Sequence, residues 1–322
     1  MLQEVVTTLC MVESPIAAIT VSPSPESGDK HEKEGLLETG PTITLVNQKP
    51  ITSSIRGTLH HIVANAGRFS RFRGFLLYLA YTAYMSLVTT FFTAALPRFP
   101  GKEILVAAVS GATVASIHAL WTHKIVSMPT DKTVWQRMPS KSHWKTLALP
   151  AAIQSAMPYV SFYLVVGFGY MLNLSQLESE AVTDFTCKQW TSLIVRIGAT
   201  LVFAVSCSLF LCVPANVTLV RIEASILPED QDTIVPFDRT FGGKVVEKVM
   251  GGTGIVGFLD AWRSFNWEAR RRLIKLYMKT FFMVACLVFL IMHVLAFEMF
   301  AIMGPALGKF IVQLKHEGFI TK

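Results

Sequence analysis

The stretch at residues 276–303, LYMKTFFMVACLVFLIMHVLAFEMFAIM, carries only two charged side chains, Lys279 and Glu298. A helix rises about 1.5 Å per residue, so roughly 20 apolar residues cross a hydrocarbon core about 30 Å thick. Four similar stretches precede it, at residues 74–96, 104–126, 147–172 and 191–213. The chain is therefore predicted to be an all-α protein, a polytopic transmembrane helix bundle with five spans.

The composition agrees with a membrane protein. Of the 322 residues, 52% are hydrophobic and 16% are charged, and the mean hydropathy is +0.46. Soluble domains carry about 25% charged residues. The net charge of +7 comes mostly from Lys and Arg beside the apolar stretches, where they set topology or meet anionic lipids. We therefore expect contact with a lipid bilayer and no binding of nucleic acid.

The segments outside the five stretches divide the chain further. Residues 1–54 are predicted to be a disordered tail, because runs such as SPSPES at 22–27 cannot bury enough apolar surface. Residues 55–73 are basic and mildly amphipathic, with Arg56, Arg68, Arg71 and Arg73 on the polar side, and are predicted to lie at the cytosolic membrane surface. The helical membrane domain is predicted at 74–318. Within it, residues 306–314 leave two alternatives open, a short sixth helix or a re-entrant segment.

Loop charges predict the orientation. The loop at 127–146 has four Lys or Arg and one acid, whereas the loop at 173–190 has three acids and one Lys. The excess of positive charge places the tail, the 127–146 loop and the 215–275 region in the cytosol. The acidic loop then faces outside, and it begins with a glycosylation sequon at Asn173. A multi-pass protein of an endomembrane, the endoplasmic reticulum or plasma membrane, is favoured over one of the mitochondrial inner membrane.

Polar side chains inside the spans are the candidate functional residues, because a charge at membrane depth costs several kcal/mol and usually faces a partner or a cavity. Two readings stay open, a substrate site and structural hydrogen bonding between helices. The candidate acids and bases are His118, His293 and Glu298. The candidate substrate-binding residues are Gln154, Arg196 and Arg221, the two arginines as partners for an anion.

Other motifs favour structural explanations. GTGIVG at 252–257 fits the dinucleotide pattern GxGxxG, but no buried strand precedes it, so we interpret it as a turn between interfacial helices. The acidic PEDQD at 228–232 has no second acidic motif to complete a magnesium site, and is interpreted as a solvated loop. Gly111, Ala115 and Ala119 recur every four residues, a spacing typical of close helix packing. Since the five cysteines form no CxxC motif, the sequence predicts no metal and no cofactor.

One motif carries a family resemblance. PANVTLVR at 214–221 closes the fourth stretch, and Pro-Thr-Asp at 129–131 follows the second. Together they resemble the ends of odd-numbered helices in the mitochondrial carrier family, where the pattern is Pro, any residue, an acid, two residues and a base. The resemblance covers residues 105–275 in part and implies a central substrate cavity. Asn216 and Leu219 stand at the positions of the acid and the base, so the salt-bridge gate of that family is not expected.

The overall organisation is also similar to membrane proteins of fungal natural-product gene clusters. Such a resemblance implies a membrane cyclase or a tailoring partner in the biosynthesis of a lipophilic compound.

Three hypotheses for function remain. The first is carrier-like transport of a lipophilic or anionic small molecule, with His293 and Glu298 as a proton-linked pair. The second is a membrane-embedded enzyme or accessory cyclase that uses His118, His293 and Glu298 as acids or bases. The third is a scaffold that recruits soluble or membrane-bound pathway partners through the tail and the 215–275 region.

Overall fold

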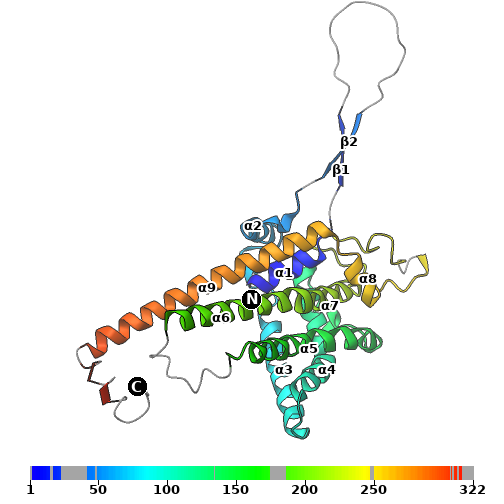
Figure 1. Cartoon of the computed structure of the whole chain (residues 1–322). Helices are drawn as coiled ribbons and strands as arrows, with labels where there is room; N and C mark the ends of the chain where they lie inside the picture. The colour runs from blue at the N-terminus through cyan, green and yellow to red at the C-terminus, as the bar shows by residue number, and fades with distance from the viewer. Residues whose placement is uncertain are drawn as a thin grey trace, which may run out of the picture.

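The computed structural model describes residues 2–14, 17–22, 42–47, 49–133, 135–174, 186–246, 250–304, 306, 308–309 and 312–313. The helices are α1 (Leu2–Val12), α2 (Ile55–Ala66), α3 (Phe75–Ala95), α4 (Lys102–Val126), α5 (Lys141–Met171), α6 (Cys187–Cys207), α7 (Val213–Ser225), α8 (Phe258–Arg263) and α9 (Trp267–Met303). Shorter turns are the 3₁₀ segments η1 (Ile51–Ser53), η2 (Arg68–Phe72) and η3 (Trp135–Arg137) and the π-helical η6 (Ser208–Cys212). Strands β1 (Ala17–Ser22) and β2 (Thr42–Asn47) pair antiparallel in a hairpin that projects from the helices (Figure 1).

Five helical runs are long and apolar enough to cross a membrane. They are Arg68–Ala95, Lys102–Val126, Lys141–Met171, Cys187–Ser225 and Trp267–Ile302. Each matches one of the five predicted stretches, and three of the runs end one residue before the predicted end. The all-α, multi-pass fold is therefore confirmed. The segment at 306–314 is described only in part, and its two alternatives stay predictions.

The fourth run continues 12 residues beyond its predicted end at 213, because α6, η6 and α7 join into one helix from Cys187 to Ser225. Proline lacks a backbone N–H and normally disrupts a helix interior. Here the π turn precedes Pro214, and the Val213 N–H donates to the carbonyl of Ser208, five residues earlier. The altered hydrogen-bond interval lets the helix pass the proline.

The main core lies where α1, the C-terminal half of α4, α7 and the first turns of α9 meet. Its most enclosed side chains include Leu9, Met11, Ile125, Val217 and Leu273.

A second cluster joins α4 to α5 and α7 through the predicted small-residue stripe. A Cβ at Gly111 would lie 2.6 Å from the Ala151 carbonyl oxygen, so the backbones of α4 and α5 approach closely there. Ala115 and Ala119 are fully buried in the same cluster. The predicted packing role of this stripe is confirmed.

The prediction of a disordered tail at 1–54 is wrong for its described residues, which form α1, the hairpin of β1 and β2, and η1. In α1, Val5, Val6 and Leu9 are almost completely buried in the core. The polar composition that suggested disorder belongs to residues 22–34, whereas LQEVVTTLCMV is apolar enough to pack on helices far along the chain. Residues 1, 15–16, 23–41 and 48 of the predicted tail lie outside the described residues.

Polar contacts at the end of α1 hold it in place. The Glu13 carboxylate accepts hydrogen bonds from the backbone N–H of Ile51 at 2.5 Å and of Thr52 at 3.2 Å, and lies 3.4 Å from the Arg272 guanidinium of α9. Burial raises the pKa of the neighbouring Cys10 thiol, which therefore stays a neutral, small apolar group. Glu13, at the end of α1, thus connects α9 to η1.

The basic segment at 55–73 forms α2 and η2, separated by Gly67 at a φ of 84°. Arg73 was predicted on the polar face, and this is wrong. Its side chain is buried and donates to the carbonyls of Lys124 and Ser127, because the C-terminal end of α4 leaves carbonyl groups without helical partners.

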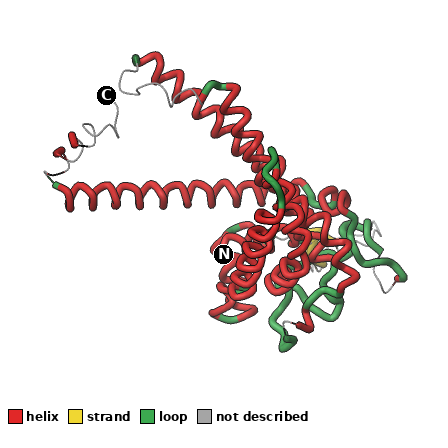
Figure 2. Tube along the Cα trace, turned by 90° about the horizontal axis from the view of Figure 1, so that it is seen from below, coloured by secondary structure: helices red, strands yellow, loops and turns green. Residues whose placement is uncertain are grey.

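Three spans leave most of their apolar surface uncovered by protein. None of the 21 residues of α3 is buried, α6 buries only Cys207, and α9 is exposed from Phe281 to Ile302. Figure 2 shows α6 and α9 diverging from the packed end of the molecule. This surface is compatible with contact with lipid chains.

Candidate functional site

A buried carboxylate joins α7 to α4. Glu223 is completely buried, and both of its carboxylate oxygens are hydrogen-bonded. Oε1 lies 2.7 Å from His118 Nδ1, and Oε2 accepts from the Thr122 hydroxyl at 2.5 Å. The Glu223 carbonyl lies 2.7 Å from His123 Nε2. We call these four residues the polar centre.

The α-helical repeat positions this centre. His118 and Thr122 are four residues apart and therefore lie on one face of α4. Thr122 and His123, one turn further on, reach the side chain and the carbonyl of the same glutamate. The sequence identified His118 but not Glu223, because the predicted fourth span ended at 213. A helix continued to residue 225 would have placed Glu223 on a packed helix.

Aromatic rings enclose His118 on the side toward α3. The Tyr81 ring centroid is 5.1 Å from the His118 ring in an edge-on arrangement, and that of Trp121 is 5.3 Å away. Tyr81 also lines a groove of about 320 Å³ between α3 and α5, with Thr82, Met85, Ser86, Thr89, Thr90 and Tyr159. The polar centre thus lies directly behind one wall of a groove rich in hydroxyl groups.

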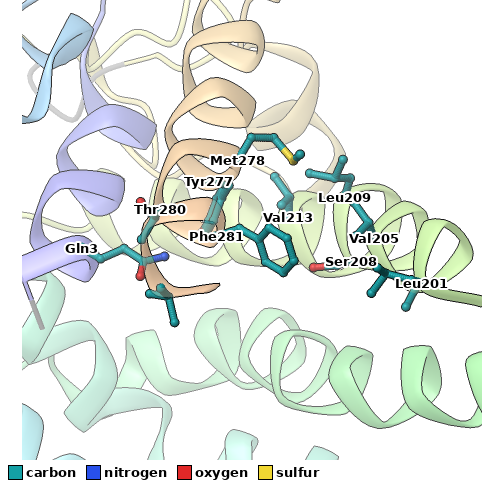
Figure 3. A pocket seen from close by; sticks show the side chains of 12 residues that line it. Gln3, Leu201, Val205, Ser208, Leu209, Val213, Tyr277, Met278, Thr280 and Phe281 are labelled. Atoms are coloured by element: carbon teal, nitrogen blue, oxygen red, sulfur yellow. The ribbon is translucent and has the colours of Figure 1, made fainter. Parts of the chain in front are cut away.

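A second concave site lies between α6 and α9, at the point where they begin to diverge. This crevice has a volume of about 430 Å³, and Figure 3 shows its side chains converging from α1, α9 and the α6–η6 junction. Its lining consists of Gln3, Leu201, Ala204, Val205, Ser208, Leu209, Val213, Tyr277, Met278, Thr280, Phe281 and Val284.

Few polar groups face this crevice. The Tyr277 hydroxyl lies 3.3 Å from Asn216 Nδ2, and the Thr280 hydroxyl donates to the Leu276 carbonyl at 2.9 Å. Ser208 begins the π turn, and π turns occur often at functional sites. The crevice is therefore an apolar site with a few hydrogen-bonding groups on its walls.

The structure does not gather the three predicted acids and bases. His293 and Glu298 are exposed on the diverging half of α9, whereas His118 is buried on α4. A ring nitrogen of His293 lies 2.8 Å from the Phe289 carbonyl of its own helix. Glu223 occupies the position beside His118 instead.

The predicted substrate-binding residues are also dispersed. Gln154 is half-buried on α5 and accepts from the neighbouring Ser155 hydroxyl at 3.3 Å. Arg196 is half-exposed on α6.

Arg221 has contacts that favour a structural role. Its guanidinium donates to the Met11 carbonyl and the Ser264 hydroxyl, both at 3.0 Å, and lies 4.9 Å from the centre of the Phe241 ring. It is buried at the join between α1 and the segment before α9.

Asn173 follows α5 in an exposed turn, at a φ of 55°. Ser175, the third residue of its sequon, lies outside the described residues. Across the ranges that the structure describes, no three His, Cys, Asp or Glu side chains come together in a group that could hold a metal ion.

Comparison with protein-family models, with curated proteins and with solved structures gives no match. The resemblance to mitochondrial carriers at residues 105–275 therefore stays a prediction.

Proposed function

We propose that this chain is an integral membrane protein that binds a lipophilic small molecule in the crevice between α6 and α9 and moves it in a carrier-like way. The crevice is the observation that carries the proposal. Its volume lies within the 300–1,000 Å³ typical of small-molecule sites, and its lining is mainly apolar with a few polar groups, as such sites usually are.

The lining also favours one substrate class. It contains no charged side chain among its 12 residues. Both terminal nitrogens of Arg221, a predicted anion partner, already donate hydrogen bonds within the protein. An apolar molecule with one or two hydrogen-bonding groups, such as a lipophilic natural product, fits this site better than an anion, because an unpaired charge in an apolar site is costly.

Filling the crevice tests the proposal. Val205→Trp adds a large side chain to the lining, whereas Val202→Trp adds the same side chain at an exposed position of α6 outside the lining. Each protein is purified from the source cells in lipid nanodiscs, and co-purified compounds are identified by mass spectrometry. We expect Val205→Trp to retain at least about tenfold less of the bound compound. The indole occupies space that the compound would fill, and a loss of about 1.4 kcal/mol of binding free energy lowers affinity tenfold.

Transport by the same proteins completes the test. In proteoliposomes, Val205→Trp is expected to abolish movement of the identified compound while Val202→Trp keeps it. Equal retention and equal transport in the two variants would contradict the proposal.

The polar centre favours a second candidate function, a membrane-embedded enzyme. His118 and Glu223 form a hydrogen-bonded imidazole–carboxylate pair behind Tyr81, and such a pair can hold and transfer a proton. A lipophilic intermediate in the hydroxyl-rich groove would be its substrate.

Metabolite profiling separates the two candidates. His118→Gln removes the proton-transferring ring, and His293→Gln changes the same residue type on the exposed half of α9. If the enzyme hypothesis holds, cells with His118→Gln accumulate an unprocessed intermediate and cells with His293→Gln do not. Compounds that are only redistributed between cells and medium favour transport instead.

We further propose that the protein lies in an endomembrane and is glycosylated at Asn173. The exposed position of Asn173 supports this proposal. Treatment with an endoglycosidase should increase the mobility of the wild-type protein on a gel and leave Asn173→Gln unchanged. No shift in either protein would contradict glycosylation.

A further inference from the structure

The turn η2 begins the first apolar run and directly precedes α3. Gly67 ends α2, and residues 68–72 then form a 3₁₀ turn before α3. A 3₁₀ helix has three residues per turn, so side chains three residues apart lie in one row. The sequence Arg-Phe-Ser-Arg-Phe-Arg at 68–73 therefore forms three rows, each with its own chemistry.

The inner row fixes the turn to the protein. The Ser70 hydroxyl donates to the Ile62 carbonyl at 3.1 Å, and Arg73 donates to the carbonyls of Lys124 and Ser127. Both inner side chains are buried. The two outer rows therefore sit on a frame held by α2 and by the end of α4.

The outer rows are apolar and basic. The side chains of Phe69 and Phe72 are 89% and 65% exposed, so the rest of the protein does not cover them. Arg68 and Arg71 are exposed too, and neither guanidinium makes a hydrogen bond or an ion pair with the described residues. The turn thus presents two aromatic rings beside two arginines that are free to bind.

Two further features concern the charge of this surface and the frame that holds it. No acidic residue occurs between Glu38 and Glu103, so no nearby sequence neighbour neutralises the arginines. Trp135 in η3 is 78% exposed. The turn η3 is held by Ser127, because Arg137 donates to its hydroxyl at 3.3 Å and Arg73 donates to its carbonyl.

We propose that η2 binds anionic phospholipid headgroups on the cytosolic face of the membrane. Phe69 and Phe72 enter the boundary between headgroups and acyl chains, as Phe does on the apolar face of interfacial helices. Arg68 and Arg71 bind the phosphate and carboxylate groups, since a guanidinium forms paired hydrogen bonds with both. The position of η2 next to α3 places it at the membrane surface, and the inference does not depend on the crevice or its ligand.

Lipid retention tests this site. The full-length protein is purified in mixed micelles of phosphatidylcholine and phosphatidylserine, and bound lipids are counted by native mass spectrometry. The test variant is Arg68→Gln with Arg71→Gln. The control, Arg98→Gln with Arg263→Gln, removes the same charge from two other exposed arginines. Arg68→Lys with Arg71→Lys keeps the charge.

The wild type and the control are expected to prefer phosphatidylserine. The test variant is expected to lose this preference by about 30-fold, because each of two basic residues near an anionic surface contributes about 1 kcal/mol. The lysine variant keeps most of it. Normal retention of phosphatidylserine in the test variant overturns the proposal. The proposal is also overturned if the test variant keeps its lipids but loses a co-purified protein, because η2 then binds a protein.

A second measurement applies if the glutamine variant fails to fold. Phe69→Trp places an indole in the aromatic row, and brominated lipids quench indoles that enter the acyl boundary. If brominated lipids quench the added indole fluorescence of Phe69→Trp, the proposal is supported. If only water-soluble iodide quenches this fluorescence, the proposal is overturned.

Discussion

Two spans of this protein, α4 and α9, show opposite relations between hydropathy and burial. In α4, 56% of the most apolar 18-residue window is buried, whereas the corresponding value for α9 is 6%, although α9 has the higher hydropathy, 2.5 against 1.7. A soluble protein would bury its most apolar helix. In this chain, the helix that lipid can cover is the more apolar one, and the helix that protein covers carries the polar partners.

The histidines of the two spans follow the same contrast. His118 on α4 pairs with the carboxylate of another helix, while His293 on α9 contacts a carbonyl of its own helix. The buried face of a span is therefore where polar side chains connect helices.

The largest expected effect comes from breaking the polar centre. Glu223→Ala leaves the buried side chains of His118 and Thr122 without their carboxylate partner. Loss of one member of a buried pair costs about 3–5 kcal/mol of unfolding free energy. Thermal unfolding in detergent measures the loss, with Glu298→Ala as the control on exposed α9. Equal midpoints for the two variants would show that the contrast between the spans is wrong.

A leucine on each span gives the next effect. Leu120 on α4 is 2% exposed and Leu290 on α9 is 61% exposed. Leu120→Ala creates a cavity and should cost about 2–5 kcal/mol. Leu290→Ala should change stability much less, since lipid or detergent fills the space. The same unfolding assay compares them, and a larger loss for Leu290→Ala would place α9 in a protein interface.

Glycine substitutions should differ in sign. A Cβ at Gly111 would meet Ser155 Oγ at 2.3 Å, whereas none of the described atoms lies within 4 Å of one at Gly198 on α6. Gly111→Ala should cost about 1–3 kcal/mol through overpacking. Gly198→Ala should stabilise by up to about 1 kcal/mol, because alanine favours helix more than glycine does. Calorimetry of both variants tests this, and destabilisation by Gly198→Ala would indicate a hidden helix contact at α6.

Local composition explains which features the sequence could predict. A run such as 276–303 identifies a span by itself, and the stripe at Gly111, Ala115 and Ala119 identifies a packing face by spacing alone. Both signals lie within one helix.

The remaining features depend on partners distant in sequence. Glu223 becomes a site residue only because α4 lies against α7, more than 100 residues away along the chain. The apolar α1 belongs to the core only because it packs against α7 and α9. The crevice requires the angle at which α6 and α9 diverge, and no pattern within either helix encodes that angle.

The burial of α1 against α9 has a consequence for synthesis of the protein. The ribosome makes α1 well before α9, since about 250 residues separate it from Trp267, where α9 begins. At about 5–20 residues per second, α1 waits roughly 10–50 s for its partner. During that interval its valines and leucine need temporary cover from a chaperone or a membrane surface. A helix translated this late therefore completes the core around one translated much earlier.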